Sequence, residues 1–181
     1  RHPTLKFALS EGGIGWVPYF LERADYVYKH HKAWTHQDFG DQLPSECFRD
    51  HIVNCFIDDK AGIDQRDKIG VETICWECDY PHSDTTWPNA PEILFEGLGK
   101  VSEAEINAMT HENAMREFRL DFTAERPKKM CTVAALRAES PNVDMSPIVN
   151  AGGTAAHEDG DRVVTGGDIV RQLAGAFVER S

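Results

Sequence analysis

Three short runs of apolar residues predict β-strands, at residues 5–10, 52–57 and 71–78. Each run is bounded by glycine, charged or turn-forming residues, which is typical of short buried strands. Between the runs, apolar residues recur at helical spacing, so predicted strands and helices alternate along the chain. This alternation favours parallel strands joined by helices, and we therefore expect an α/β fold.

Helical patterns occupy most of the sequence between and after the predicted strands. In residues 16–31, Val17, Leu21 and Tyr28 fall on one face, and charged residues take the other. Shorter helices are predicted after Pro44, at residues 61–68 and 90–98, from the capping box of Ser102 and Glu105 onwards, at 110–120, at 133–138 and at 168–178. Loop-forming residues dominate beyond residue 121. We therefore expect one body at residues 1–121 and a C-terminal extension with little regular structure at 122–181.

Length and composition are those of a single globular domain, with 181 residues of which 41% are hydrophobic. The 30 acidic and 19 basic residues give a formal net charge of -11, which repels nucleic-acid phosphates, so we expect no nucleic-acid partner. The apolar runs are too short to span a membrane, and the first residues lack the pattern of a secretory leader. We expect no membrane association and a cytoplasmic location.

The five cysteines are interpreted as reduced side chains inside the protein. Cys75 and Cys78 form a Cys-x-x-Cys pair, which in other settings marks a redox or zinc site. Here the pair lies in a predicted strand, where neighbouring side chains point to opposite faces, and no second Cys/His pair stands at zinc-ribbon spacing. We therefore expect no redox or zinc function from this pair.

The third predicted strand ends in residues that can carry chemistry, namely Asp79, Tyr80, Pro81 and His82. A carboxylate beside a divalent ion can ligate the ion and accept a proton from water whose pKa the ion has lowered. Asp79 could equally be a turn or helix N-cap residue, and His82 a surface loop residue. The residues alone leave both alternatives open.

A larger combination of motifs resembles one family. The segment 79–84, Asp-Tyr-Pro-His-Ser-Asp, follows a strand, and Trp87-Pro88 comes just behind it. After a capped helix stands the segment 113–118, Asn-Ala-Met-Arg-Glu-Phe. Together with the glycine-rich end of the first strand, these motifs resemble the metal-dependent amidohydrolase superfamily over residues 4–121. Within it, the chain is similar to the branch that includes aminocarboxymuconate-semialdehyde decarboxylase.

That resemblance implies a (β/α)8 TIM barrel, whose site lies at the C-terminal ends of its strands. The three predicted strands would be strands six to eight. The earlier strands, with the His-x-His and the further histidine that bind metal in the family, do not occur in this sequence. Three strands cannot close a barrel, so we expect the partner to be a missing N-terminal barrel half, in a longer protein or a separate chain, or a homo-oligomer partner.

The resemblance also implies roles for two carboxylates. Asp79 matches the aspartate of the eighth strand, which binds the metal or steers the nucleophilic water. Glu11 stands where the family usually has a histidine in Ala-His-Gly-Gly, because the sequence here is Ser-Glu-Gly-Gly at 10–13. A glutamate can perform general acid/base chemistry when its surroundings tune its pKa. Glu11 could alternatively pair with an arginine at the barrel mouth.

Three further residues complete the expected site. His82 could contact substrate or orient Asp79, and Trp16 and Trp87 follow strand ends, where they can line the pocket or pack at its mouth. The function implied is a metal-dependent hydrolase that acts on a small carboxylic acid derivative, ester or amide, with a divalent metal, zinc by preference. The alternatives are a non-oxidative decarboxylase of the same superfamily and a non-catalytic fragment or accessory subunit.

Overall fold

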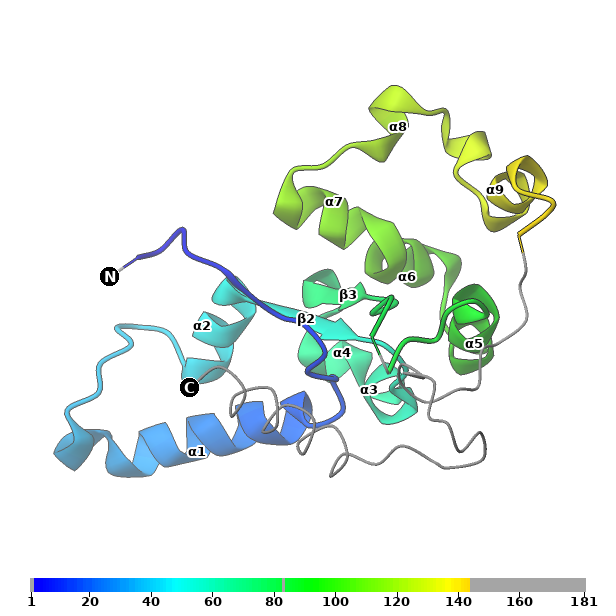
Figure 1. The fold of residues 1–181 in the computed structure, drawn as a ribbon. Coiled ribbons are helices and arrows are strands. Elements are labelled where there is room, and N and C mark those ends of the chain that lie inside the picture. Colours follow the sequence, from blue (N-terminus) through cyan, green and yellow to red (C-terminus); the bar gives the residue numbers. More distant parts are fainter. Residues whose placement is uncertain (1, 83, 144–181) are drawn as a thin grey trace, which may run out of the picture. The chain divides into compact units, whose positions relative to one another are not determined.

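The computed structural model describes residues 2–82 and 84–143, and the statements below concern these residues (Figure 1). The helix predicted at 168–178 lies outside them. No helix in the described residues is both long enough and apolar enough to cross a membrane.

A three-stranded parallel sheet lies at the centre of the described chain, in the order β1-β2-β3. Its strands are β1 (Phe7–Leu9), β2 (Ile52–Phe56) and β3 (Ile74–Trp76). Leu9 pairs with Asn54, and Asn54 pairs with Ile74 on its other side. The α/β class and the parallel pairing predicted from the sequence are confirmed.

The third strand is shorter than predicted, because residues 71–78 do not all extend. Val71–Thr73 form a 3-10 turn, η1, and only Ile74–Trp76 belong to the sheet. Gly70 has φ 109°, a conformation that favours glycine, and its carbonyl accepts hydrogen bonds from the backbone N–H and the hydroxyl of Thr73, both at 2.9 Å. These local bonds turn the chain just before it can enter the sheet.

Helices flank the sheet along the sequence. They are α1 (Val17–Thr35), α2 (Pro44–His51), α3 (Lys60–Asp64), α4 (Arg66–Ile69), α5 (Ala90–Gly97), α6 (Glu103–Asn107), the π-helical segment η2 (Ala108–Glu112), α7 (Asn113–Phe118), α8 (Phe122–Glu125), the 3-10 turn η3 (Lys128–Met130) and α9 (Val133–Glu139). The predicted 61–68 helix is interrupted at Gln65, whose backbone N–H bonds back to Gly62 at 3.1 Å. α1 runs four residues beyond its predicted end, to Thr35, and α6, η2 and α7 follow one another without a break.

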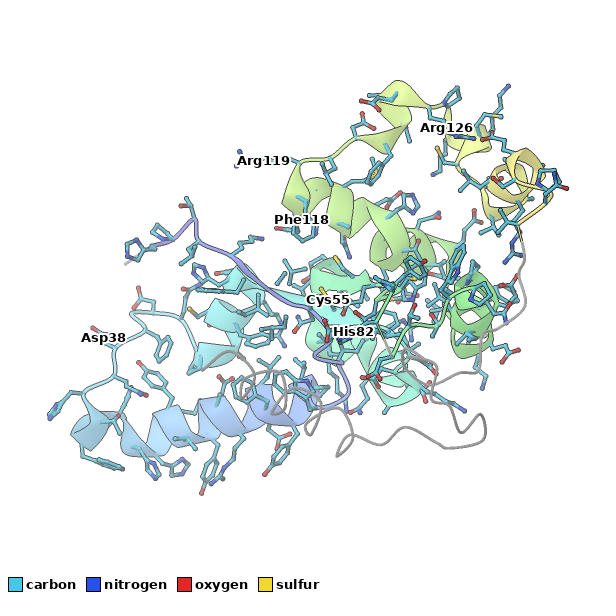
Figure 2. The ribbon with its side chains drawn as sticks, viewed as in Figure 1. Asp38, Cys55, His82, Phe118, Arg119 and Arg126 are labelled. Carbon is cyan, nitrogen blue, oxygen red and sulfur yellow. The ribbon has the colours of Figure 1, made fainter. Side chains whose placement is uncertain are left out.

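The core forms where β2 and β3 meet α1, α3, α4, the end of α5 and η2. Its buried members are Ile14, Val17, Leu21, Phe56, Ile63, Ile69, Ile74, Leu98 and Met109. Because side chains alternate along a strand, the neighbours of Phe56 and Ile74 face the other way and form a second, smaller cluster. That cluster contains Val53, Cys55 and Cys75, with Ala114 of α7 packed against it. Cys55 is labelled in Figure 2.

All five cysteines are free thiols, but only Cys55 and Cys75 are buried as predicted, whereas Cys47, Cys78 and Cys131 are partly exposed. Burial raises the pKa of the Cys55 thiol to about 12 and that of the Cys75 thiol to about 11. Both therefore stay protonated near neutral pH and act as small apolar side chains.

Two polar side chains fix the loops at the strand ends. The carboxylate of Asp59 accepts backbone N–H bonds from Ile14 and Gly15, both at 2.7 Å, and from Gly62 at 2.8 Å. This ties the segment after β1 to the segment after β2. The buried Asn113 side chain donates to the carbonyls of Val71 and Ile74, both at 2.8 Å, and so holds the start of β3.

Candidate functional site

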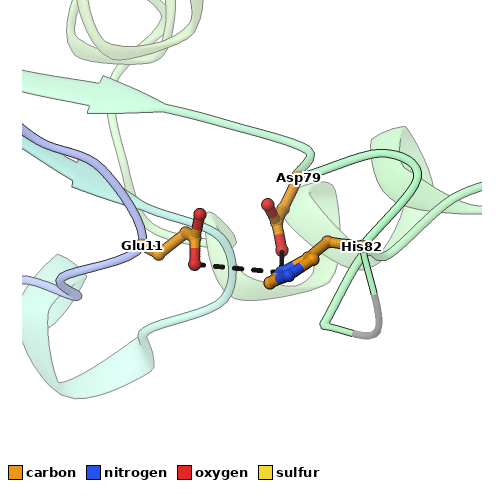
Figure 3. Close-up of side chains that lie close together, drawn as sticks. All are labelled: Glu11, Asp79 and His82. Atoms are coloured by element: carbon orange, nitrogen blue, oxygen red, sulfur yellow. Dashed lines mark hydrogen bonds and ion pairs between the residues drawn. The ribbon is translucent and has the colours of Figure 1, made fainter. Parts of the chain in front are cut away.

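Three predicted site residues come together at the C-terminal edge of the sheet. Glu11 lies in the turn after β1, and Asp79 and His82 lie in the loop after β3 (Figure 3). One potential ligand atom from each lies within 4.8 Å of the others. Glu11 and Asp79 are far apart in sequence, and the parallel sheet brings them together because the carboxyl ends of its strands share one edge.

The His82 ring lies between the two carboxylates. Its Nδ1 is 3.1 Å from Asp79 Oδ2 and 3.8 Å from Glu11 Oε2. The Asp79 side chain is 11% exposed, whereas those of Glu11 and His82 are 51% and 63% exposed. Asp79 is thus the sheltered member, and the other two face open space.

Both carboxylate residues have backbone conformations that are uncommon for residues other than glycine. The φ angle is 59° at Glu11 and 56° at Asp79, in the left-handed region. Such a conformation costs about 1 kcal/mol at each position and persists where surrounding contacts impose it. Strain at two residues that converge on one point supports a functional role for the cluster.

Glu77 holds the turn that carries Glu11, and sequence reasoning missed it. The carboxylate of Glu77 accepts hydrogen bonds from the hydroxyl of Ser10 and from the backbone N–H of Glu11. The available signal was its position, because Glu77 directly follows the third strand, at the strand end where barrel enzymes place their site residues.

Trp16 and Trp87 each pack on a loop that carries a site residue. The indole N–H of Trp16 lies 3.0 Å from the carbonyl oxygen of Gly12 and 3.1 Å from that of Gly13, in the turn after Glu11. The Trp87 ring packs edge-on against Tyr80, with 5.6 Å between ring centroids. Contact of either indole with substrate stays a prediction.

Thr85 closes the loop after β3, and it too was missed. Its hydroxyl donates to the carbonyl of Cys78 at 2.6 Å and accepts from the backbone N–H of Trp87 at 3.2 Å. Cys78 immediately precedes Asp79, so these two bonds fix the exit of the loop next to the site.

The donor set fits a divalent cation. Two carboxylate oxygens and an imidazole nitrogen are ligands that zinc, manganese and iron accept in proteins. Glu77 adds a third carboxylate nearby, so the local charge attracts a cation. Among residues 2–82 and 84–143, Glu11, Asp79 and His82 are the three side chains whose potential ligand atoms lie close enough together, within 4.8 Å, to share one metal ion.

Two cavities of the described residues lie away from this cluster. One of about 550 Å³ lies among α5, η2 and η3 and is lined mainly by apolar side chains, including Trp76, Leu94 and Met115. Another of about 600 Å³ lies between α1 and α2. Neither is lined by Glu11, Asp79 or His82, and the exposure of Glu11 and His82 shows that the cluster lies at an open edge of the sheet.

Comparison with known proteins identifies the family. A family model described as amidohydrolase matches residues 1–120. A solved structure, that of 5-carboxyvanillate decarboxylase from Sphingomonas paucimobilis, superposes with a TM-score of 0.52 and is 25% identical over 65% of this chain. The chain spans only 34% of that decarboxylase. A search of curated proteins finds no match. The resemblance inferred from the strand-end motifs is confirmed at the level of the superfamily: the chain belongs to the amidohydrolase family.

Proposed function

We propose that this chain forms one wall of the active site of a metal-dependent hydrolase that acts on a small carboxylic acid derivative, ester or amide. The observation that carries this proposal is the convergence of Glu11, Asp79 and His82 at the C-terminal edge of a parallel sheet. In barrel enzymes that edge is where catalytic residues stand. Membership of the amidohydrolase family supports the same assignment.

The roles of the three residues follow from their surroundings. Asp79 is the sheltered carboxylate, so it holds the cation and accepts a proton from the attacking water. His82 contacts Asp79 Oδ2 and keeps that carboxylate oriented. Glu11 is half exposed and faces the same point, so its negative charge helps to hold the cation, and the same carboxylate transfers a proton to or from the substrate. A divalent ion, zinc by preference, would polarise the substrate and lower the pKa of the water.

The rest of the site comes from outside this chain. The strand β1 lies at one edge of the sheet, and Phe7 on it is 56% exposed. An exposed aromatic on an edge strand is the surface that a further strand and helix of a barrel would cover. We infer that the missing N-terminal barrel half, or a partner subunit, supplies the remaining metal ligands and closes the barrel.

Non-oxidative decarboxylation is the second candidate. It is favoured by the structural likeness to a decarboxylase over 65% of this chain. In that reaction the cation would bind the substrate carboxylate, while Glu11 would protonate the carbon from which carbon dioxide leaves. The two candidates differ in product, because one yields a hydrolysed acid and the other yields carbon dioxide.

Metal analysis and turnover of the full-length protein test the proposal. The substrates are a panel of small esters, amides and aromatic carboxylic acids, and the products measured are free acid and carbon dioxide. Asp79→Asn should lower both metal content and turnover by at least about tenfold, whereas Asp84→Asn, which removes an exposed carboxylate from the same loop, should leave both unchanged. A parent protein without bound metal, or an Asp79→Asn variant as active as the parent, would instead favour a non-catalytic module.

A further inference from the structure

Glu77 is a charged side chain at the site to which the proposed mechanism gives no role. It follows β3 directly, and its backbone N–H continues the sheet ladder by bonding the Phe56 carbonyl at 2.9 Å. Next to it, the indole of Trp76 donates to the Ile57 carbonyl at 3.2 Å. The backbone of Glu77 is therefore held against β2, and its side chain starts from a fixed point.

From that point the Glu77 carboxylate reaches across β2 to the turn after β1. One oxygen accepts the Ser10 hydroxyl and the other accepts the backbone N–H of Glu11. Hydrogen bonds to a carboxylate are about twice as strong as those between neutral groups. A single side chain thus fastens the end of β1 to the end of β3.

The turn that carries Glu11 needs such a restraint. Gly12 and Gly13 follow Glu11, and Gly13 has φ 60°. Two glycines make a backbone that samples many conformations unless it is held. Trp16 and Asp59 bond this segment only from Gly12 onwards, so Glu77 is the side chain that restrains the backbone of Glu11 itself. The backbone of Glu11 has a left-handed conformation and its side chain is half exposed, so that side chain does little to fix the turn.

We infer that Glu77 is a positioning residue. It holds the backbone of Glu11 in the conformation from which the Glu11 carboxylate faces His82 and Asp79. This inference rests on the proposed function, since it assigns to Glu77 the preorganisation of the cation-binding cluster described there. Both oxygens of Glu77 already accept hydrogen bonds from the turn, so Glu77 acts through Glu11 and does not itself ligate the cation.

Two substitutions separate this role from simple loss of charge. Glu77→Ala removes both bonds. Glu77→Gln keeps them, because the amide oxygen can accept the Glu11 N–H while the amide NH2 donates to the Ser10 hydroxyl oxygen. The control is Glu72→Ala, which removes an exposed carboxylate from η1 just before β3.

The first measurement is hydrogen exchange of the Glu11 amide, followed by NMR on the 181-residue chain. The second is the affinity of the full-length protein, which carries the remaining ligands, for Mn2+, followed by electron paramagnetic resonance. In Glu77→Ala the amide should exchange about tenfold faster and Mn2+ affinity should fall about tenfold. In Glu77→Gln and Glu72→Ala both quantities should stay within about threefold of the parent.

The outcomes distinguish this inference from the proposed function. Unchanged Glu11 exchange in Glu77→Ala overturns the positioning role. Equal loss of Mn2+ affinity in Glu77→Gln and Glu77→Ala also overturns it, because the carboxylate itself would then be a ligand. A full-length parent protein that binds no Mn2+, while the chain shows the expected exchange pattern, supports the positioning role and overturns only the cation site of the proposed function.

Discussion

Asp59 offers the sharpest test of how this fold is held together. Its carboxylate accepts three backbone N–H bonds at 2.7–2.8 Å, two from the segment after β1 and one from the first turn of α3. Asp59→Ala removes all of them and leaves three partly buried N–H groups without a protein partner. At about 1.5 kcal/mol for each bond to a charged acceptor, less some replacement by water, the free energy of unfolding should fall by about 3–4 kcal/mol.

Two companion variants make the estimate specific. Asp59→Asn keeps an oxygen for Ile14 and Gly15 but turns an NH2 group toward the Gly62 N–H, so it should cost about 2 kcal/mol. Asp58→Ala removes the exposed neighbouring carboxylate and should stay within about 0.5 kcal/mol of the parent. The measurement is urea unfolding followed by far-UV circular dichroism, with the slope against urea unchanged.

The reasoning fails if Asp59→Ala lowers the free energy of unfolding by less than about 1 kcal/mol. It also fails if Asp58→Ala costs as much as Asp59→Ala, because a general charge effect would then explain both.

Three further predictions concern single side chains. Gly62→Ala would place a Cβ 2.2 Å from a core side-chain carbon and should lower the free energy of unfolding by about 2–3 kcal/mol. Gly97→Ala, with nothing within 4 Å of its Cβ, should raise it by up to about 1 kcal/mol, and equal melting temperatures of the two variants would contradict this. Asn113→Leu leaves two carbonyl groups without their donor and should cost about 2–4 kcal/mol in urea unfolding; a cost below about 1 kcal/mol would show that these bonds contribute little. The hydrogen bond from Arg66, and to a smaller extent that from the Ser102 hydroxyl, lowers the pKa of Glu105 to about 2. The Arg66–Glu105 ion pair therefore stabilises the fold fully above about pH 4.5, and this contribution is lost as the pH falls toward about 2. Glu105→Gln should therefore cost about 1 kcal/mol at pH 7 and progressively less toward pH 2, and a cost independent of pH would refute the assignment.

Local sequence pattern predicted the elements well, because strands and helices are decided largely by neighbouring residues. The three strands lie where their apolar runs predicted them, and the capping box of Ser102 and Glu105 forms as expected. The exception is the start of the third strand, where the Gly70 conformation and the Thr73 hydroxyl favour a turn over extension. Apolar pattern cannot reveal this, since it carries no information on the backbone angle of Gly70 or on the bond that the Thr73 hydroxyl makes.

The site was harder to predict than the fold. Asp79 and His82 stand out because they end a strand within a recognisable motif. Glu11 emerged only through the family resemblance, since a glutamate before two glycines has no signature of its own. The roles of Glu77 and Asp59 depend on bonds across 66 and 45 residues of sequence, which exist only once the sheet register is set. Side chains that bond distant backbone groups therefore escape prediction from local pattern.

The left-handed backbone at Glu11 and Asp79 has a consequence for engineering. Glycine would adopt either conformation without steric cost, so replacing both residues by glycine would relieve strain in the folded state while deleting the two carboxylates. Under the proposed function, two carboxylate side chains at positions suited to glycine represent a trade of stability against activity. Thermostabilised versions of this protein should keep both positions fixed and seek their gains elsewhere.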